Sequence, residues 1–211
     1  MIRISSVRRR LAAAGGVLLA TAALSACGTG PAHQGAAAVV GGERISIATV
    51  ESRVAELRTA VAAQQGGART EPTGLTRRMV AELVLDKVVA QALADRQLTV
   101  TPGEIADARD ADSKLLGGSD ALGRELLLKQ AVPAAGIDGF YRQQLGIQKI
   151  AGAEGKDART PEGDAAVRTA LTTAGAELKV QVNPRYGQWD VKQISLVDAA
   201  DAWLPQTAAA A

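Results

Sequence analysis

The stretch LTRRMVAELVLDKVVAQALADRQ, residues 75–97, is the longest segment with helical periodicity in this chain of 211 residues. Its apolar residues recur at spacings of three and four and form a band too broad for a helix that lies on the surface. They are Met79, Val80, Leu83, Val84, Val88, Val89, Ala92 and Leu93. We therefore predict that this helix is the most buried element and that the other elements surround it.

The segment before this helix combines a hairpin with a second helix. Residues 39–47, VVGGERISI, are typical of two very short strands around Gly41-Gly42, a pair that allows positive φ. From Ser46 onward the period becomes helical. The apolar positions of that helix are Val50, Val54, Leu57 and Val61.

Four more helices are expected after the central one. The sequence TPGE, residues 101–104, fits a capping box with Pro at the first helical position, and TPEG, residues 160–163, opens the last helix in the same way. Ser119 is expected to cap a helix that Pro133 ends, and residues 137–152 form another. The residues expected to face inward are Ile105, Ala108, Ala111, Leu115, Leu122, Leu126, Leu127, Ile137, Phe140, Ile147, Ile150, Val167 and Leu171.

After these helices the period becomes two. Residues 177–182, ELKVQV, alternate apolar and polar positions, which predicts a half-buried strand. The next stretch, VNPRYGQWDV (residues 182–191), holds two of the five aromatic residues of the chain.

The residues of this aromatic stretch allow two interpretations. In one, Tyr186 and Trp189 form a ligand platform with Arg185 as an anion clamp. In the favoured one the stretch is structural: Pro184 and Gly187 turn the chain, and Trp189 begins a second strand that closes the core against the hairpin near Val39 and Val40. We therefore assign Pro184, Tyr186, Gly187 and Trp189 to structural closure of the domain.

The N-terminus, MIRISSVRRRLAAAGGVLLATAALSAC, has the order of an export signal. Basic residues precede an uncharged apolar run, residues 11–23, that is shorter than the roughly 20 residues of a membrane-spanning helix. Leu24, Ser25, Ala26 and Cys27 then resemble the lipobox of bacterial lipoproteins, which implies a diacylglycerol and acyl chains such as palmitate on Cys27. The alternative is an ordinary signal peptide with a chance Cys, and the Sec and twin-arginine routes both stay open.

This organisation excludes several function classes. Without residues 1–26, which hold four Arg and no acidic residue, the formal charge falls from +2 to −2, so no nucleic-acid partner is expected. The single His, His33, and the single Cys argue against a catalytic triad, a metal site or a cofactor. Asp107, Asp110 and Asp112 lack the Gly and distal Glu of a calcium loop and are expected on a solvated helix face. The chain is therefore predicted not to be an enzyme.

The order of these segments resembles the N-terminal domain of SurA-type and PrsA-type extracytoplasmic chaperones. The similar stretches are AAVVGGERISIATVESRVAELR (37–58), LVLDKVVAQALADRQLTVTPGEI (83–105), FYRQQLGIQKI (140–150) and VNPRYGQWDV (182–191). The resemblance implies a mostly α, multi-helix domain with a small antiparallel β element made by the N-terminal hairpin and the C-terminal strands. Larger relatives often carry a parvulin isomerase domain before the returning strand. Here residues 152–177 are too few for a domain, which needs at least about 50 residues, so no isomerase activity is expected.

We therefore predict a signal peptide (1–26), a flexible tether (27–38), a SurA-like helical domain (39–197) and a disordered tail (198–211). The predicted function is that of a lipoprotein anchored to the cell membrane on its extracytoplasmic side, which binds unfolded or exported polypeptides. The alternative is a scaffold for one specific envelope protein. With 2% aromatic residues, any client-binding cleft is expected to be lined by Leu, Val, Ile and Met, and the sequence does not place it.

Overall fold

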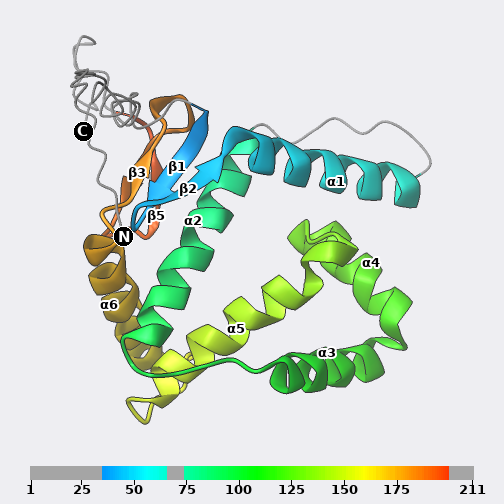
Figure 1. Cartoon of the computed structure of the whole chain (residues 1–211). Helices are drawn as coiled ribbons and strands as arrows, with labels where there is room; N and C mark the ends of the chain where they lie inside the picture. Colours follow the sequence, from blue (N-terminus) through cyan, green and yellow to red (C-terminus); the bar gives the residue numbers. More distant parts are fainter. Residues whose placement is uncertain (1–34, 66–73, 200–211) are drawn as a thin grey trace, which may run out of the picture. The chain divides into compact units, whose positions relative to one another are not determined.

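The computed structural model describes residues 35–65 and 74–199, which fold mainly into helices (Figure 1). The α-helices are α1 (Ile47–Gln65), α2 (Leu75–Ala94), α3 (Pro102–Leu116), α4 (Ser119–Gln130), α5 (Ile137–Gly152) and α6 (Pro161–Glu177). The short 3-10 helices are η1 (Ala134–Gly136) and η2 (Pro184–Tyr186). The strands are β1 (Ala36–Val40), β2 (Glu43–Ser46), β3 (Gln181–Val182), β4 (Gln188–Asp190) and β5 (Ser195–Val197). The predicted mostly α fold with a small antiparallel β element is confirmed.

The β element joins the two ends of the described chain. β1 pairs with β2 across Gly41 and Gly42, whose φ angles of 59° and 82° confirm the predicted turn. On its other side β1 pairs antiparallel with β3, where Ala38 lies opposite Val182. β4 and β5 form a separate two-stranded sheet. Among the C-terminal strands, β3 thus returns to the N-terminal hairpin.

The strand β1 begins earlier than the sequence suggested. We predicted a flexible tether through residue 38, but Ala36, Ala37 and Ala38 are fully buried. Asn183 holds this part of β1 in the sheet. Its backbone N–H donates to the Ala37 carbonyl (2.9 Å), and its side-chain amide donates to the Ala36 carbonyl (3.2 Å). The small alanine side chains, which suggested flexibility, allow this part of the strand to be completely enclosed.

The strand predicted after the last helix is shorter than expected. The expected strand over residues 177–182 is reduced to β3, because α6 continues to Glu177 and Lys179 turns the chain with a φ of 47°. The carbonyl of Leu178 is still used by the sheet, since it accepts a hydrogen bond from the Gly41 N–H (2.7 Å). The alternation of apolar and polar residues over 177–182 therefore corresponds to a partly buried turn followed by a short strand, and not to one long strand.

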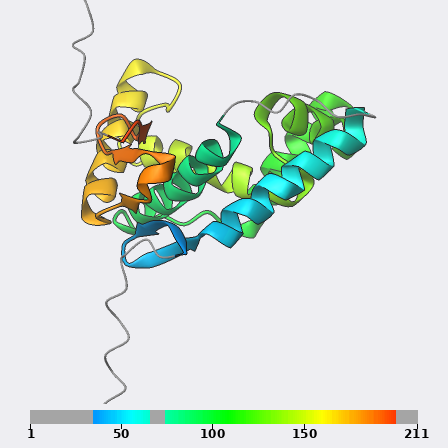
Figure 2. The ribbon, with the colours of Figure 1, turned by 90° about the horizontal axis from the view of Figure 1, so that it is seen from above.

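The helix α2 is the central helix of the domain, as predicted. It contacts α1, α5, α6 and β1. Figures 1 and 2 show α2 with the β element and α6 on one side and with α3, α4 and α5 on the other. Its buried residues are Leu75, Met79, Val80, Val84, Val88, Val89, Ala92 and Leu93. Gly146 of α5 lies against this helix, and a Cβ there would be 3.1 Å from side-chain carbons of Val89 and Leu93. Close approach of two helices therefore explains a glycine inside α5.

A second, smaller hydrophobic cluster holds α3, α4 and α5 together. Its buried members are Ile105, Leu122, Leu126 and Tyr141. The inward positions predicted for α4 are confirmed, but those predicted for the end of α3 are wrong. Ala111 is exposed and Leu115 is 85% exposed.

The caps predicted for the starts of α3 and α6 are present, whereas the cap predicted for α4 is not. At α3 the capping box is present: the Glu104 N–H donates to Thr101 Oγ1 (3.3 Å) and the Thr101 N–H donates to Glu104 Oε2 (2.8 Å). At α6 the Thr160 hydroxyl accepts from the Gly163 N–H (3.1 Å). At α4 the prediction is wrong, because Gly118 is the N-cap residue and Ser119 makes no side-chain cap.

Replacing Thr101 with alanine is expected to lower the free energy of unfolding by about 1 kcal/mol, because the substitution removes the acceptor that caps α3. Urea denaturation followed by helical circular dichroism measures the change. Ser119→Ala is the matched control, since Ser119 caps nothing, and it should change stability by less than about 0.5 kcal/mol. Equal effects of the two substitutions would contradict the capping argument.

Candidate functional site

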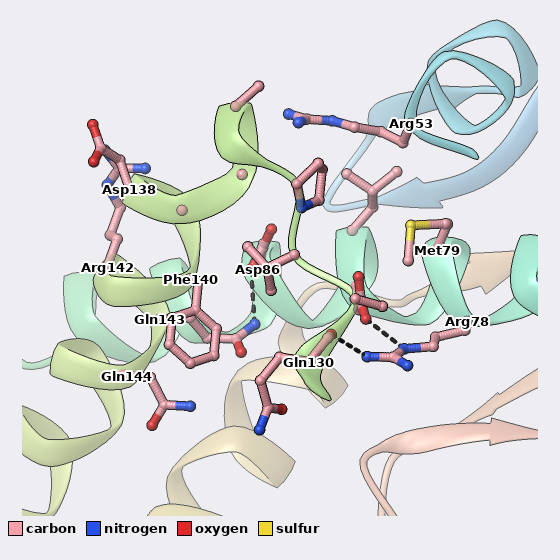
Figure 3. A pocket seen from close by; sticks show the side chains of 18 residues that line it. Arg53, Arg78, Met79, Asp86, Gln130, Asp138, Phe140, Arg142, Gln143 and Gln144 are labelled. Carbon is pink, nitrogen blue, oxygen red and sulfur yellow. Dashed lines mark hydrogen bonds and ion pairs between the residues drawn. The ribbon is translucent and has the colours of Figure 1, made fainter. Parts of the chain in front are cut away.

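A hollow of about 430 Å³ lies between α1, α2 and the segment from the end of α4 to α5 (Figure 3). Its apolar lining comes from both sides. Met79 and Leu83 belong to α2, while Val132, Pro133 and Phe140 belong to the opposite wall. The hollow thus has an apolar component contributed by several elements of the domain.

Charged groups of both signs accompany these apolar residues. The lining holds Arg53, Arg78, Arg142, Glu82, Asp86 and Asp138. Three arginines and three carboxylates give a formal charge of zero. The hollow as a whole therefore favours neither acidic nor basic ligands.

Two of the three carboxylates are already paired with arginine. Arg78 Nε lies 2.8 Å from Glu82 Oε1, and Arg78 also donates to the backbone carbonyl of Gln130 (2.7 Å), which connects α2 to the end of α4. Asp138 accepts a hydrogen bond from Arg109 of α3 (3.2 Å). These interactions fix the rim of the hollow and leave few charged groups unengaged.

The third carboxylate, Asp86, lies inside the hollow. Protein atoms around it remove part of its hydration, which raises its pKa, although the carboxylate remains in contact with solvent. The hydrogen bond from Gln143 (2.8 Å) and the charges of Arg53, Arg142 and Lys87 oppose this rise without cancelling it. As the pH falls, Asp86 is therefore protonated before an ordinary aspartate, and the hollow gains positive charge.

The sequence reasoning did not identify this site. Its residues come from positions 53, 78–86 and 130–144, which are far apart in the chain. One usable signal was Asp86, a carboxylate that follows Leu85 in the apolar stretch of the central helix. Phe140, the only Phe of the chain, lines the hollow beside aliphatic residues such as Leu83 and Val132.

The predicted lipid site belongs to the N-terminal part of the sequence. Leu24, Ser25, Ala26 and Cys27 lie outside the residues that the structure describes, and so does His33. Within residues 35–65 and 74–199, no helix combines the length and apolar character that crossing a membrane requires.

The aromatic stretch near the C-terminus lies in the main core, and none of its four predicted residues lines the hollow. Tyr186 and Trp189 are 6% and 7% exposed, which leaves little surface for a ligand platform. Pro184 starts η2, and Gly187 has a φ of 111°. The guanidinium carbon of Arg185, Cζ, lies over the Tyr186 ring, 5.0 Å from the ring centroid.

Trp189 belongs to the main core and lies beside α6. If residue 175 of α6 had a Cβ, that atom would lie 3.6 Å from the indole Nε1 and 3.9 Å from a side-chain carbon of Val88 in α2. Trp189 also pairs with Leu196 of β5. Arg77 of α2 holds this sheet through a hydrogen bond to the Leu196 carbonyl (2.9 Å). The indole therefore packs within van der Waals range of position 175 on α6.

The acidic residues of α3 are engaged in ordinary contacts. Asp112 accepts a hydrogen bond from the Tyr141 hydroxyl (2.8 Å), and burial together with this bond raises the pKa of Tyr141. Asp110 pairs with Arg109 (3.6 Å). Among the described residues, no group of three or more His, Cys, Asp or Glu side chains could hold a metal ion.

The sequence model of one protein family matches this chain. The family is described as the SurA-like N-terminal domain, and the match covers residues 4–116, which is more than half of the chain. This range includes the hairpin and α1 to α3, and such domains are of chaperone type rather than catalytic. Comparisons with curated proteins and with solved structures gave no match. The chain therefore belongs to the family of SurA-like N-terminal domains.

Proposed function

We propose that this protein is a lipoprotein that binds exported polypeptides outside the cytoplasm, in the manner of a chaperone and without isomerase activity. The observation that carries the proposal is membership of the SurA-like family. The lipobox-like sequence ending at Cys27 supports attachment to the membrane. Two acyl chains on one residue give stable anchoring where one chain is marginal.

The hollow between α1, α2 and α5 is the proposed client-binding site. Its volume of about 430 Å³ lies within the range of roughly 300–1,000 Å³ found for sites that enclose a ligand. Apolar residues from two walls, Leu83 and Phe140 among them, can contact client side chains, while the charged rim remains hydrated. A segment of an unfolded chain fits such a hollow, whereas a folded partner requires a broader contact surface.

The segment between α5 and β3 is the reason for proposing that the protein has no isomerase activity. A short connection and α6 occupy residues 153–180, and α6 is part of the main core through Val167, Ala170, Leu171 and Ala174. This is the position at which larger relatives carry a parvulin domain. The segment here serves the core of the SurA-like domain itself.

Light scattering tests the chaperone function. The purified chain is expected to slow aggregation of several unrelated unfolded proteins at equal or lower molar ratio. Leu83→Asp should weaken the effect, because it introduces a charge at the apolar wall, and Ala90→Asp on the exposed face of α2 is the matched control. Failure to protect any substrate would exclude a chaperone role.

A scaffold for one envelope partner remains the second candidate. The observation that favours it is the small number of exposed large apolar residues: in residues 35–65 and 74–199 these are Leu115, Leu116 and Leu128. A general chaperone surface usually exposes more apolar area. Co-purification of one envelope protein at equal stoichiometry, with no protection of unrelated substrates, would favour the scaffold.

Replacing Cys27 with serine is expected to abolish lipid attachment, because serine cannot form the thioether to diacylglycerol. Intact mass and partition into a detergent phase measure the loss. Ser25→Ala is the matched control, since a small residue remains before the Cys and lipidation should persist. If wild-type protein carries no lipid mass on Cys27, the anchoring proposal is wrong.

A further inference from the structure

Three glutamine side chains lie around the apolar part of the hollow. Gln143 and Gln144 follow Phe140 by three and four residues on α5, so they share its helical face. Gln130 reaches the hollow from the end of α4. Figure 3 shows the three amides together with the Phe140 ring. The hollow therefore combines an aromatic surface with amide groups.

Two of these amides are available to a ligand. The Gln143 amide donates to Asp86 (2.8 Å), which holds it in place. The side chains of Gln130 and Gln144 are exposed and form no hydrogen bond to any other described residue. Each amide offers an N–H donor and a carbonyl acceptor, the same pair of groups that a polypeptide main chain presents.

The charged residues of the hollow give it little preference for a charged ligand. Glu82 is paired with Arg78, Asp138 with Arg109, and Arg53 with Glu56. The remaining charged residues of the lining are Arg142 and Asp86, which have opposite charges. A charged client side chain would therefore gain little net attraction. The unengaged amides and the apolar wall are left as the groups that distinguish one ligand from another.

From these contacts we infer that the hollow binds an extended, uncharged polypeptide segment by its main chain. The amides of Gln130 and Gln144 bond to main-chain N–H and C=O groups, and one apolar side chain of the segment lies against Phe140. This inference rests on the proposed function and specifies the client. Main-chain bonding supplies affinity that does not depend on sequence, while the apolar contact supplies a preference for aliphatic or aromatic residues.

Fluorescence anisotropy with matched peptides tests the inference. The probe is the labelled peptide Ser-Thr-Gly-Val-Leu-Val-Gly-Thr-Ser, added to the full chain in lipid nanodiscs, with empty nanodiscs as the blank. Methylation of the main-chain nitrogens around the central Leu should weaken binding about tenfold, because it removes two hydrogen-bond donors. Methylation at the two terminal residues is the control and should have little effect, as should Lys or Glu in place of the outer Thr residues.

Variants of the protein connect the effect to the two amides. In the double variant Gln130→Met, Gln144→Met, the unmethylated peptide should bind about tenfold more weakly, and the difference between the two peptides should nearly disappear. Gln148→Met is the matched control, because Gln148 is an exposed residue of α5 that does not line the hollow. It should preserve both affinity and discrimination.

The outcomes separate this inference from the proposed function. If wild-type protein binds both peptides equally, or if the double variant still discriminates, main-chain recognition by these amides is excluded. Should the protein then still suppress aggregation of unfolded substrates, only this inference fails. When it neither binds the peptides nor suppresses aggregation, the proposed chaperone function fails as well.

Discussion

Replacing Trp189 with alanine is expected to lower the free energy of unfolding by about 3–5 kcal/mol, the usual loss when a buried large aromatic residue is truncated. The indole is 7% exposed and lies between β4 and α6, close to Gly175 and Val88. Its removal leaves a cavity where the C-terminal strands meet the central helices. Urea denaturation of the full chain, followed by helical circular dichroism, measures the loss.

Trp189→Phe is the informative control for this prediction. The indole Nε1 is buried and has no hydrogen-bond partner among the described residues. Phenylalanine retains much of the apolar volume and removes the unpaired donor, whose burial costs about 1–3 kcal/mol. The Phe variant should therefore lose at most about half as much stability as the Ala variant. An Ala variant with normal stability but impaired client binding would instead support the ligand-platform interpretation of this stretch.

Features that depend on neighbouring residues could be predicted from the sequence. The capping box at residues 101–104 and the Gly41-Gly42 turn are confirmed because their hydrogen bonds and φ angles are determined within four residues. The apolar band of α2 is also confirmed, since its breadth alone requires partners on several sides. These elements were sufficient to establish the mostly helical class.

Features that depend on the partner surface could not be predicted in this way. Ala36 is buried because Asn183, 147 residues away, binds its carbonyl, and no local pattern encodes that contact. Leu115 has the spacing of an inward residue, but no described residue covers its side chain, which is 85% exposed. The hollow is the extreme case, since three separate segments form it and only Asp86 stands out in the sequence. Periodicity identifies which face is apolar but does not say how far the partner extends.

Replacing Gly163 with alanine is expected to lower the free energy of unfolding by at least about 2 kcal/mol, at the level of a severe steric conflict. A Cβ at this position would overlap the backbone carbonyl of Asp157 and lie 3.0 Å from Cα of Ala158. The Asp157 carbonyl is held in place, because the backbone N–H and the hydroxyl of Thr160 both donate to it (3.0 and 2.8 Å). Since the obstructing atoms belong to the backbone, no side-chain rotation can relieve the overlap.

The same chemical change elsewhere should have the opposite sign. Gly123 lies inside α4, and a Cβ there would have no heavy atom within 4 Å outside its immediate surroundings in the helix. Gly123→Ala should therefore raise the free energy of unfolding by up to about 1 kcal/mol, because alanine favours the helix over glycine. Chemical denaturation of both variants compares them directly. If Gly163→Ala were also stabilising, the close contact between α6 and the preceding loop would be absent in solution. The contrast tests packing rather than helix propensity, since propensity alone predicts a gain at both positions.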